Sequence, residues 1–188
     1  DKGSLFNKEG TEMLHYAKNQ DENIYHIPNG VSVIGDSAFY GCETLYSVIL
    51  PDTVKKINAR VFSACKNLQE IIFSKNIRKI DWYAFENCES LIKLDLPQGL
   101  HSIENRTFAG CKNLNCLILP DSIKKIKYSS FADCDALLSV TVGVGVEIDE
   151  SAFPSHTKIL RIESEKNFDK KDGHEKSSSK KKWFSFFK

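Results

Sequence analysis

The sequence predicts a mainly β protein, with short loops and helical turns, that winds into a right-handed solenoid of 23-residue repeats. Five consecutive blocks align without a gap from Pro28 to Val142, beginning at Pro28, Pro51, Ser74, Pro97 and Pro120. Each block holds one phenylalanine, one cysteine and one leucine at fixed positions. The phenylalanines are Phe39, Phe62, Phe85, Phe108 and Phe131; the cysteines are Cys42, Cys65, Cys88, Cys111 and Cys134; the leucines are Leu45, Leu68, Leu91, Leu114 and Leu137. One block alone leaves its apolar face in water, whereas stacked blocks bury these residues in one core.

Each block contains two places where apolar residues are spaced as in short strands. In the second block these are Val54 with Ile57, and Leu68 with Ile71 and Phe73. We therefore expect two short strands per turn, with successive turns roughly 4.7–4.9 Å apart, as in hydrogen-bonded sheets. Burying one phenylalanine per turn contributes roughly 1.5–3 kcal/mol, so the stability is expected to come from stacking.

The repeat becomes irregular at both ends of the chain. A sixth block runs from Gly143 to about Ile162. Its apolar positions are kept if one residue is lost after Val146, which places Ile159 and Ile162 in the core and His156 in the cysteine register. Upstream of Pro28, Tyr25 and Ile27 supply the last strand of an incomplete first turn, and the residues expected to form a cap are Leu5, Phe6, Met13, Leu14 and Tyr16. The predicted division is therefore a cap and incomplete first turn (1–26), a solenoid (27–162) and a polar, lysine-rich tail with an aromatic C-terminus (163–188).

The repeat resembles a known family. The stretches IPNGVSVIGDSAFYGCETL and LPDTVKKINARVFSACKNL resemble the BspA-like, or Treponema pallidum type, leucine-rich repeat, whose unit is IPxxVxxIxxxAFxxCxxLxxIxL. The resemblance covers residues 24–162, and the third block departs from it mainly by having Ser74 in place of proline. It implies a leucine-rich repeat solenoid in proteins commonly secreted or displayed on bacteria and some protozoa, where they bind host proteins or other cells. It brings no shared catalytic residues.

Composition and charge exclude several classes of protein. The 188-residue chain is 41% hydrophobic and carries a formal net charge of +1, so it has no overall attraction for nucleic acid or anionic membrane. No apolar run approaches the roughly 18 residues of a transmembrane helix. The start at Asp1 does not resemble a signal peptide, so we expect an intracellular protein or one whose targeting segment has been removed.

The cysteines and histidines indicate packing more than chemistry. Five cysteines recur every 23 residues, which predicts an internal ladder of small buried side chains. Zinc sites instead use pairs of closely spaced cysteines. Cys116 stands in an outward position, where a redox or covalent role is the alternative to an inert thiol. No Ser/His/Asp grouping, phosphate loop or pair of carboxylates stands out, so we expect no enzyme, no cofactor and no metal.

A basic stripe is expected along the first strand of successive blocks. Its residues are Lys55, Lys56, Arg78, Lys79, Lys124 and Lys125. It predicts binding to an acidic protein or an anionic glycan. The alternative is a solvated face whose charges repel only weakly because salt screens them.

The second strand of each block predicts a mixed apolar and polar face that suits a protein partner. Its candidate residues are Tyr46, Ile49, Glu70, Ile72, Lys93 and Asp95. The isoleucines could instead turn inward or serve only as strand formers. Trp82, just before a ladder phenylalanine, is a candidate platform for a sugar or partner, or a cover for the edge of the core.

The last residues of the chain, KKKWFSFFK, combine a basic cluster with aromatic side chains. Lys181, Trp183, Phe184 and Phe187 are candidates for contact with an anionic membrane surface. The alternatives are a cap on the open last turn or a disordered tail.

These observations predict a non-enzymatic protein-binding or adhesion module of a cell-surface or secreted protein. The expected partner is a protein, with host or extracellular-matrix proteins as candidates, and nucleic acid is not expected. One alternative is an intracellular, cytoplasmic scaffold that docks at a membrane through its C-terminal tail. Another is a carbohydrate-binding accessory module that takes an anionic glycan.

Overall fold

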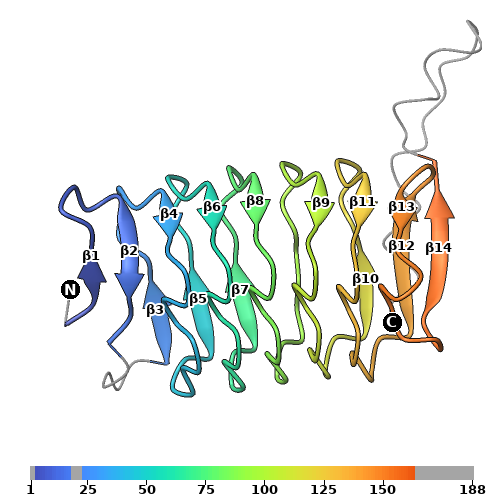
Figure 1. Cartoon of the computed structure of the whole chain (residues 1–188), viewed down its shortest axis with the longest axis horizontal. Helices are drawn as coiled ribbons and strands as arrows, with labels where there is room; N and C mark the ends of the chain where they lie inside the picture. The colour runs from blue at the N-terminus through green and yellow to red at the C-terminus, as the bar shows by residue number, and fades with distance from the viewer. Residues whose placement is uncertain (1–2, 18–22, 164–188) are drawn as a thin grey trace, which may run out of the picture.

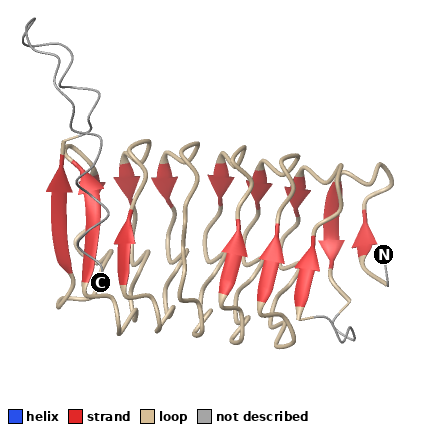
Figure 2. Ribbon diagram, turned by 180° about the vertical axis from the view of Figure 1, so that it is seen from behind, coloured by secondary structure: helices blue, strands red, loops and turns tan. Residues whose placement is uncertain are grey.

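The computed structural model describes residues 3–17 and 23–163, which form a β-solenoid with the N-terminal strands at one end and the last blocks at the other (Figure 1). The described residues are strands, turns and bends, without helix (Figure 2). The predicted fold class is confirmed, with one difference. The expected helical turns are non-helical turns around each phenylalanine.

Two rows of short parallel strands run along the solenoid (Figure 1). The first ladder consists of β2 (Glu12–His15), β4 (Val33–Ile34), β6 (Lys56–Ile57), β8 (Lys79–Ile80), β9 (Ser102–Ile103), β11 (Lys125–Ile126) and β13 (Glu147–Ile148). The second ladder consists of β3 (Ile24–His26), β5 (Ser47–Ile49), β7 (Glu70–Ile72), β10 (Cys116–Ile118), β12 (Ser139–Gly143) and β14 (Lys158–Ile162). From β4 to β12 the paired residues are one repeat apart, as in Lys56 with Lys79.

Both ladders are interrupted between the third and fourth blocks. The hydrogen-bonded strands of the first ladder end at β8 and begin again at β9, and only the bridge between Glu70 and Lys93 extends the second ladder beyond β7. Gly99 lies at this point, and a Cβ atom there would collide with the carbonyl oxygen of Ile77. The backbones of the two blocks therefore approach one another closely where the sheets are broken.

A third column of backbone hydrogen bonds continues across this interruption. The N–H of each ladder phenylalanine donates to a carbonyl of the following block, at 2.8 Å from Phe62 to Ala84 and from Phe85 to Thr107. The residues two positions before and after also donate, as Arg60 does to Trp82 and Ala64 does to Glu86. Each block is thus joined to the next by hydrogen bonds outside the two ladders.

The donors that flank each phenylalanine have left-handed backbone. Positive φ recurs two residues before it, at Ser37, Arg60, Tyr83, Arg106 and Ser129, and two residues after it, at Gly41, Ala64, Asn87, Gly110 and Asp133. This alternation lets three N–H groups of one segment point along the solenoid axis. For residues with a Cβ the conformation costs roughly 1–2 kcal/mol each, which the axial hydrogen bonds offset.

The core is a column of stacked phenylalanine rings. Consecutive ring centroids lie 4.9 Å apart for Phe39 and Phe62, 5.1 Å for Phe62 and Phe85, and 5.3 Å for Phe85 and Phe108. All five ladder phenylalanines are fully buried. Offset stacking of this kind adds about 0.5–1.5 kcal/mol per pair to the burial of apolar area.

The N-terminal end is more regular than the sequence indicated. β1 (Leu5–Phe6) pairs antiparallel with β2, and β2 and β3 then pair with the first block. Tyr16, expected in the cap, occupies the phenylalanine register and stacks on Phe39 with centroids 4.8 Å apart. The turn before Pro28 therefore contributes both ladder strands and one aromatic ring to the core.

The register expected for the last block is wrong. Ile159 pairs with Val140 and Ile162 with Gly143, so further residues are lost after Phe153. Ile159, Ile162 and His156 are exposed. Within the described residues β14 has a neighbouring strand on one side only, which leaves its apolar side chains less covered than those of the inner blocks.

Ala64→Gly is expected to stabilise the protein by up to about 1 kcal/mol, because Ala64 has φ of 61° and glycine adopts this conformation without a steric penalty. Urea unfolding followed by circular dichroism measures the change. Ala59→Gly in the same block is the matched control, since Ala59 has no positive φ. It should destabilise by about 0.5–1 kcal/mol through the entropy of the unfolded chain. Equal destabilisation by both changes would contradict the prediction.

Candidate functional site

The outward positions of the second ladder form a continuous surface along the solenoid. Ile49 stands beside Ile72 on paired strands, and Tyr46 lies just before β5. Tyr46 and Ile72 are exposed and Ile49 is partly exposed, so none of the three turns into the core. The structure therefore places these candidates together on one face, and the inward alternative for Ile49 and Ile72 is wrong.

The most exposed apolar residues of this face lie further along the chain. Ile92, Ile118 and Leu138 are 61%, 74% and 59% exposed, and they belong to the third, fourth and fifth blocks. They were not among the candidate residues. Their registers are those of Tyr46 and Ile49, so the repeat alignment alone contains the signal that finds them.

A group of charges lies beside these apolar residues. The Lys93 ammonium group is 3.0 Å from Oε1 of Glu70 and 3.4 Å from Oδ2 of Asp95. The hydrogen bonds that Lys93 donates to Glu70 and Asp95 raise the pKa of its ammonium group. These exposed groups contribute little to stability. They give the face a polar border with fixed charges.

Two of the six basic residues in the stripe, Lys79 and Lys125, are paired with acids. Lys79 lies 2.7 Å from Asp81, and Lys125 lies 3.2 Å from Glu147. Burial alone would raise the pKa of Asp81, but the hydrogen bonds it accepts from Lys79 and from the N–H of Trp82 lower it. The stripe is therefore weaker as an anion-binding surface than its sequence indicates.

The other members of the stripe lie at the exposed edge of the same ladder. Arg78 donates to the backbone carbonyl of Ile77 at 3.1 Å, and Lys124 donates to that of Asp121 at 3.2 Å. Lys55 is exposed and Lys56 is partly exposed.

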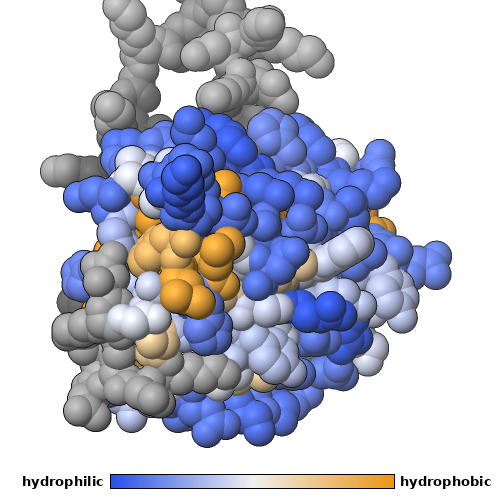
Figure 3. Space-filling view, turned by 60° about the vertical axis from the view of Figure 1, so that its left-hand side comes forward, coloured by the Kyte–Doolittle hydropathy of each residue, from blue (hydrophilic) through white to orange (hydrophobic). Residues whose placement is uncertain are grey.

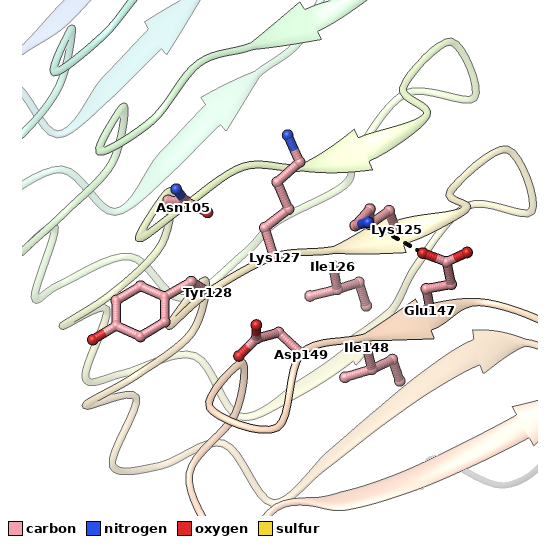
Figure 4. Close-up of a pocket in the computed structure, with 8 residues that line it drawn as sticks. All are labelled: Asn105, Lys125, Ile126, Lys127, Tyr128, Glu147, Ile148 and Asp149. Atoms are coloured by element: carbon pink, nitrogen blue, oxygen red, sulfur yellow. Dashed lines mark ion pairs between the residues drawn. The ribbon is translucent and has the colours of Figure 1, made fainter.

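Two shallow grooves lie where the first ladder passes into the turn before a phenylalanine. One is about 350 Å³ in volume and is bordered by Trp82; the other is about 370 Å³ and is bordered by Tyr128 (Figure 4). In Figure 4, Tyr128 and Asp149 lie at one end of the second groove and the pair of Lys125 and Glu147 lies at the other. Trp82 is 52% exposed, so it does not cover the core.

The cysteine ladder is structural, as predicted. From the second block on, each ladder thiol donates to the carbonyl of the phenylalanine in the preceding block, over 3.1 Å from Cys88 to Phe62 and 3.2 Å from Cys134 to Phe108, whereas Cys42 contacts Oγ1 of Thr44. Burial raises the pKa of Cys134 to about 12 and that of Cys88 well above its usual value. These thiols stay protonated and unreactive. Cys116 is exposed on the second ladder, 3.4 Å from Oγ of Ser139.

Within residues 3–17 and 23–163, no group of three or more histidine, cysteine, aspartate or glutamate side chains is placed to hold a metal ion. The same ranges contain no helix that could span a membrane. The tail candidates Lys181, Trp183, Phe184 and Phe187 lie outside the described residues.

Comparison with family models identifies the repeat. Residues 16–138 match the BspA type leucine-rich repeat region, with six copies of the unit. The chain belongs to this family. Repeats of this type are generally non-enzymatic scaffolds. No curated protein matches the chain.

Solved structures share the fold. The leucine-rich repeat protein of Treponema pallidum is 25% identical with a TM-score of 0.67, over 83% of this chain and 82% of that one. A leucine-rich repeat protein from Bacteroides ovatus is 28% identical with a TM-score of 0.62, over 75% of this chain and 42% of that one. The pneumococcal vaccine antigen PcpA is 20% identical with a TM-score of 0.78, over 90% of this chain and 43% of that one, and shows the fold alone. The chain spans less than half of the last two proteins.

We expect a thiol reagent such as Ellman's reagent to modify one cysteine per chain in the folded protein, because five of the six are buried and Cys116 is exposed. The absorbance of the released thionitrobenzoate counts the modified thiols. Cys116→Ser should remove the fast reaction, and urea should expose the remaining five. Fast modification of more than one thiol in the folded protein would show that the ladder is open.

The ladder also predicts a loss of stability at alkaline pH. The Cys134 pKa is raised in the folded state to about 12 from its usual 9, so above pH 9 the unfolded chain releases a proton that the folded chain keeps. The free energy of unfolding should then fall by up to about 1.4 kcal/mol per pH unit for this group. Urea unfolding between pH 8 and 10.5 measures the slope. Cys134→Ala should make it shallower, and an unchanged slope would contradict the assignment.

Proposed function

We propose that the chain is a non-enzymatic protein-binding module of a cell-surface or secreted protein, and that its partner docks on the outward face of the second ladder. The observation that carries the proposal is the exposure of Ile92, Ile118 and Leu138 on three consecutive blocks. Figure 3, which brings the N-terminal end forward, shows a mostly hydrophilic surface with one hydrophobic patch near the centre of the view.

The energetics of these side chains favour a protein partner. Covering one exposed isoleucine or leucine contributes roughly 1.5–3 kcal/mol, so a few such residues supply the central contacts of an interface. The charges of Glu70, Lys93 and Asp95 lie at the edge of this patch, where polar groups set orientation and the rate of association. An extended solenoid face suits a large partner surface better than a small ligand.

The surface location rests on the family resemblance, since BspA-like repeats are commonly displayed on bacteria and some protozoa. An extracellular-matrix or host protein is the partner class that fits this setting. The outward face of the second ladder also fits this partner class, because it offers apolar contacts together with charges of both signs. It therefore requires no highly charged partner.

Ile118→Asp should weaken binding to the matrix protein that the wild-type chain captures by about 30-fold or more, because a central contact is worth about 2 kcal/mol and a charge replaces it. Surface plasmon resonance against immobilised fibronectin, laminin and collagen measures the affinity. Tyr40→Ala is the matched control, since Tyr40 is exposed outside the face and its loss should change the affinity less than twofold.

Cys116 offers a second test on the folded wild-type protein. Its side chain lies in β10 beside Ile118, so alkylation with a bulky maleimide should block the same interface. Undiminished binding by both the alkylated protein and Ile118→Asp would refute the proposed docking face. Capture of none of the three matrix proteins would refute the proposed partner class.

A further inference from the structure

The two grooves of the first ladder are built from equivalent positions of the repeat. The Trp82 groove is lined by Asp36, Lys56, Asn58, Arg60, Asp81 and Trp82. The Tyr128 groove is lined by Asn105, Lys125, Lys127, Tyr128, Glu147 and Asp149. In each groove a lysine from a first-ladder strand, a carboxylate just beyond such a strand and an aromatic ring recur in the same registers. The repeat has therefore produced two related grooves, which differ in that Trp82 comes from the block after that of Lys56, whereas Tyr128 and Lys125 belong to the same block.

The aromatic rings of Trp82 and Tyr128 are both exposed to solvent. Trp82 and Tyr128 occupy the same position of the third and fifth blocks, which places them two strand spacings, or about 10 Å, apart along the solenoid. They are 52% and 56% exposed. The neighbouring ring of Tyr83 is instead covered by Arg60, whose guanidinium carbon lies 4.8 Å from the ring centroid. Trp82 and Tyr128 thus present ring surface that the described residues leave uncovered.

The charges of both grooves are balanced. The Trp82 groove has Lys56 and Arg60 against Asp36 and Asp81, and the last of these is also paired with Lys79. The Tyr128 groove balances in the same way, with two lysines against two carboxylates (Figure 4). Neither groove therefore has a strong electrostatic potential of one sign, which an ionic ligand would require. Both supply hydrogen-bond donors and acceptors for neutral polar groups.

One acceptor in the Trp82 groove is not used within the described part of the protein. Oδ1 of Asn58 is buried and has no hydrogen-bond partner there, which costs roughly 1–3 kcal/mol if it stays unpaired. Asp36 uses one carboxylate oxygen to hold the N–H of Ala59 at 3.0 Å, so its position is fixed. A ligand hydroxyl can donate to the Asp36 carboxylate, and it reaches Oδ1 of Asn58 only after a shift of that side chain, because the atom is shielded from solvent. The groove therefore offers hydrogen-bond acceptors to a hydroxyl-rich molecule.

We propose that this edge of the solenoid binds a neutral linear oligosaccharide, with Trp82 and Tyr128 as two stacking platforms. One face of a sugar ring is a set of C–H groups that packs on an aromatic ring, while its hydroxyls bond to carboxylates and amides at the rim. Groove volumes of about 350 and 370 Å³ accommodate a sugar ring at each site. A linear chain along the solenoid axis reaches both rings. This site is separate from the proposed protein-docking face.

Isothermal titration calorimetry with cellohexaose and maltohexaose tests the proposal, with heparin as the anionic comparison. At least one neutral hexaose should bind, unchanged between 50 and 500 mM NaCl. Trp82→Ala and Tyr128→Ala should each weaken it about tenfold, the effect of losing one aromatic contact. The matched control Tyr40→Ala and the docking-face variant Ile118→Asp should bind as the wild type does.

Two further measurements sharpen the result. In a Trp183→Phe background Trp82 is the only tryptophan, so its fluorescence should change on binding to the hexaose. The corresponding disaccharide should bind at least tenfold more weakly, because it cannot reach both rings. The proposal is overturned if neither hexaose binds, if heparin alone binds, or if the double variant Trp82→Ala/Tyr128→Ala keeps wild-type affinity. None of these outcomes bears on binding of a protein at Ile118.

Discussion

The hydrogen bonds along the solenoid axis, made by the segment around each phenylalanine, are the constraint on which the rest of the structure depends. They require left-handed backbone on both sides of the phenylalanine, and that geometry directs the ring inward and the neighbouring N–H groups toward the next block. The ring stacking and the thiol contacts follow, because the carbonyls of Phe39, Phe62, Phe85 and Phe108 each accept the thiol of the next block. This column continues where both ladders are interrupted, so it alone joins the two halves of the solenoid without a gap.

This division of tasks leaves the outward positions free to carry function. Inward positions repeat phenylalanine, cysteine and leucine because the column leaves space for little else, whereas most outward positions vary from block to block. Residues 23 positions apart become neighbours. A substitution in one block therefore alters a surface that also includes residues of the two adjacent blocks. The apolar face at Ile118 and the aromatic edge at Trp82 are two such surfaces on one scaffold.

The sequence was sufficient for the features that repetition reveals and insufficient for those that depend on backbone geometry. The registers of phenylalanine, cysteine and leucine identified the core. The same alignment contained the outward position of Ile92 and that of Leu138, although neither was chosen as a binding candidate. The left-handed residues were hidden, since arginine and tyrosine there carry no glycine signal. The last block was misaligned because apolar residues such as Ile159 fit two registers equally well.

The interruption between the third and fourth blocks has a consequence for how a bound partner acts on the scaffold. Ile92 lies on one side of it and Ile118 on the other. A protein that covers both residues therefore contacts two blocks that are not joined by strand pairing. Occupancy would then damp the relative twisting of the two halves and slow amide hydrogen exchange around Gly99. A partner bound to the docking face would in this way reinforce the solenoid at the point where both strand ladders are interrupted.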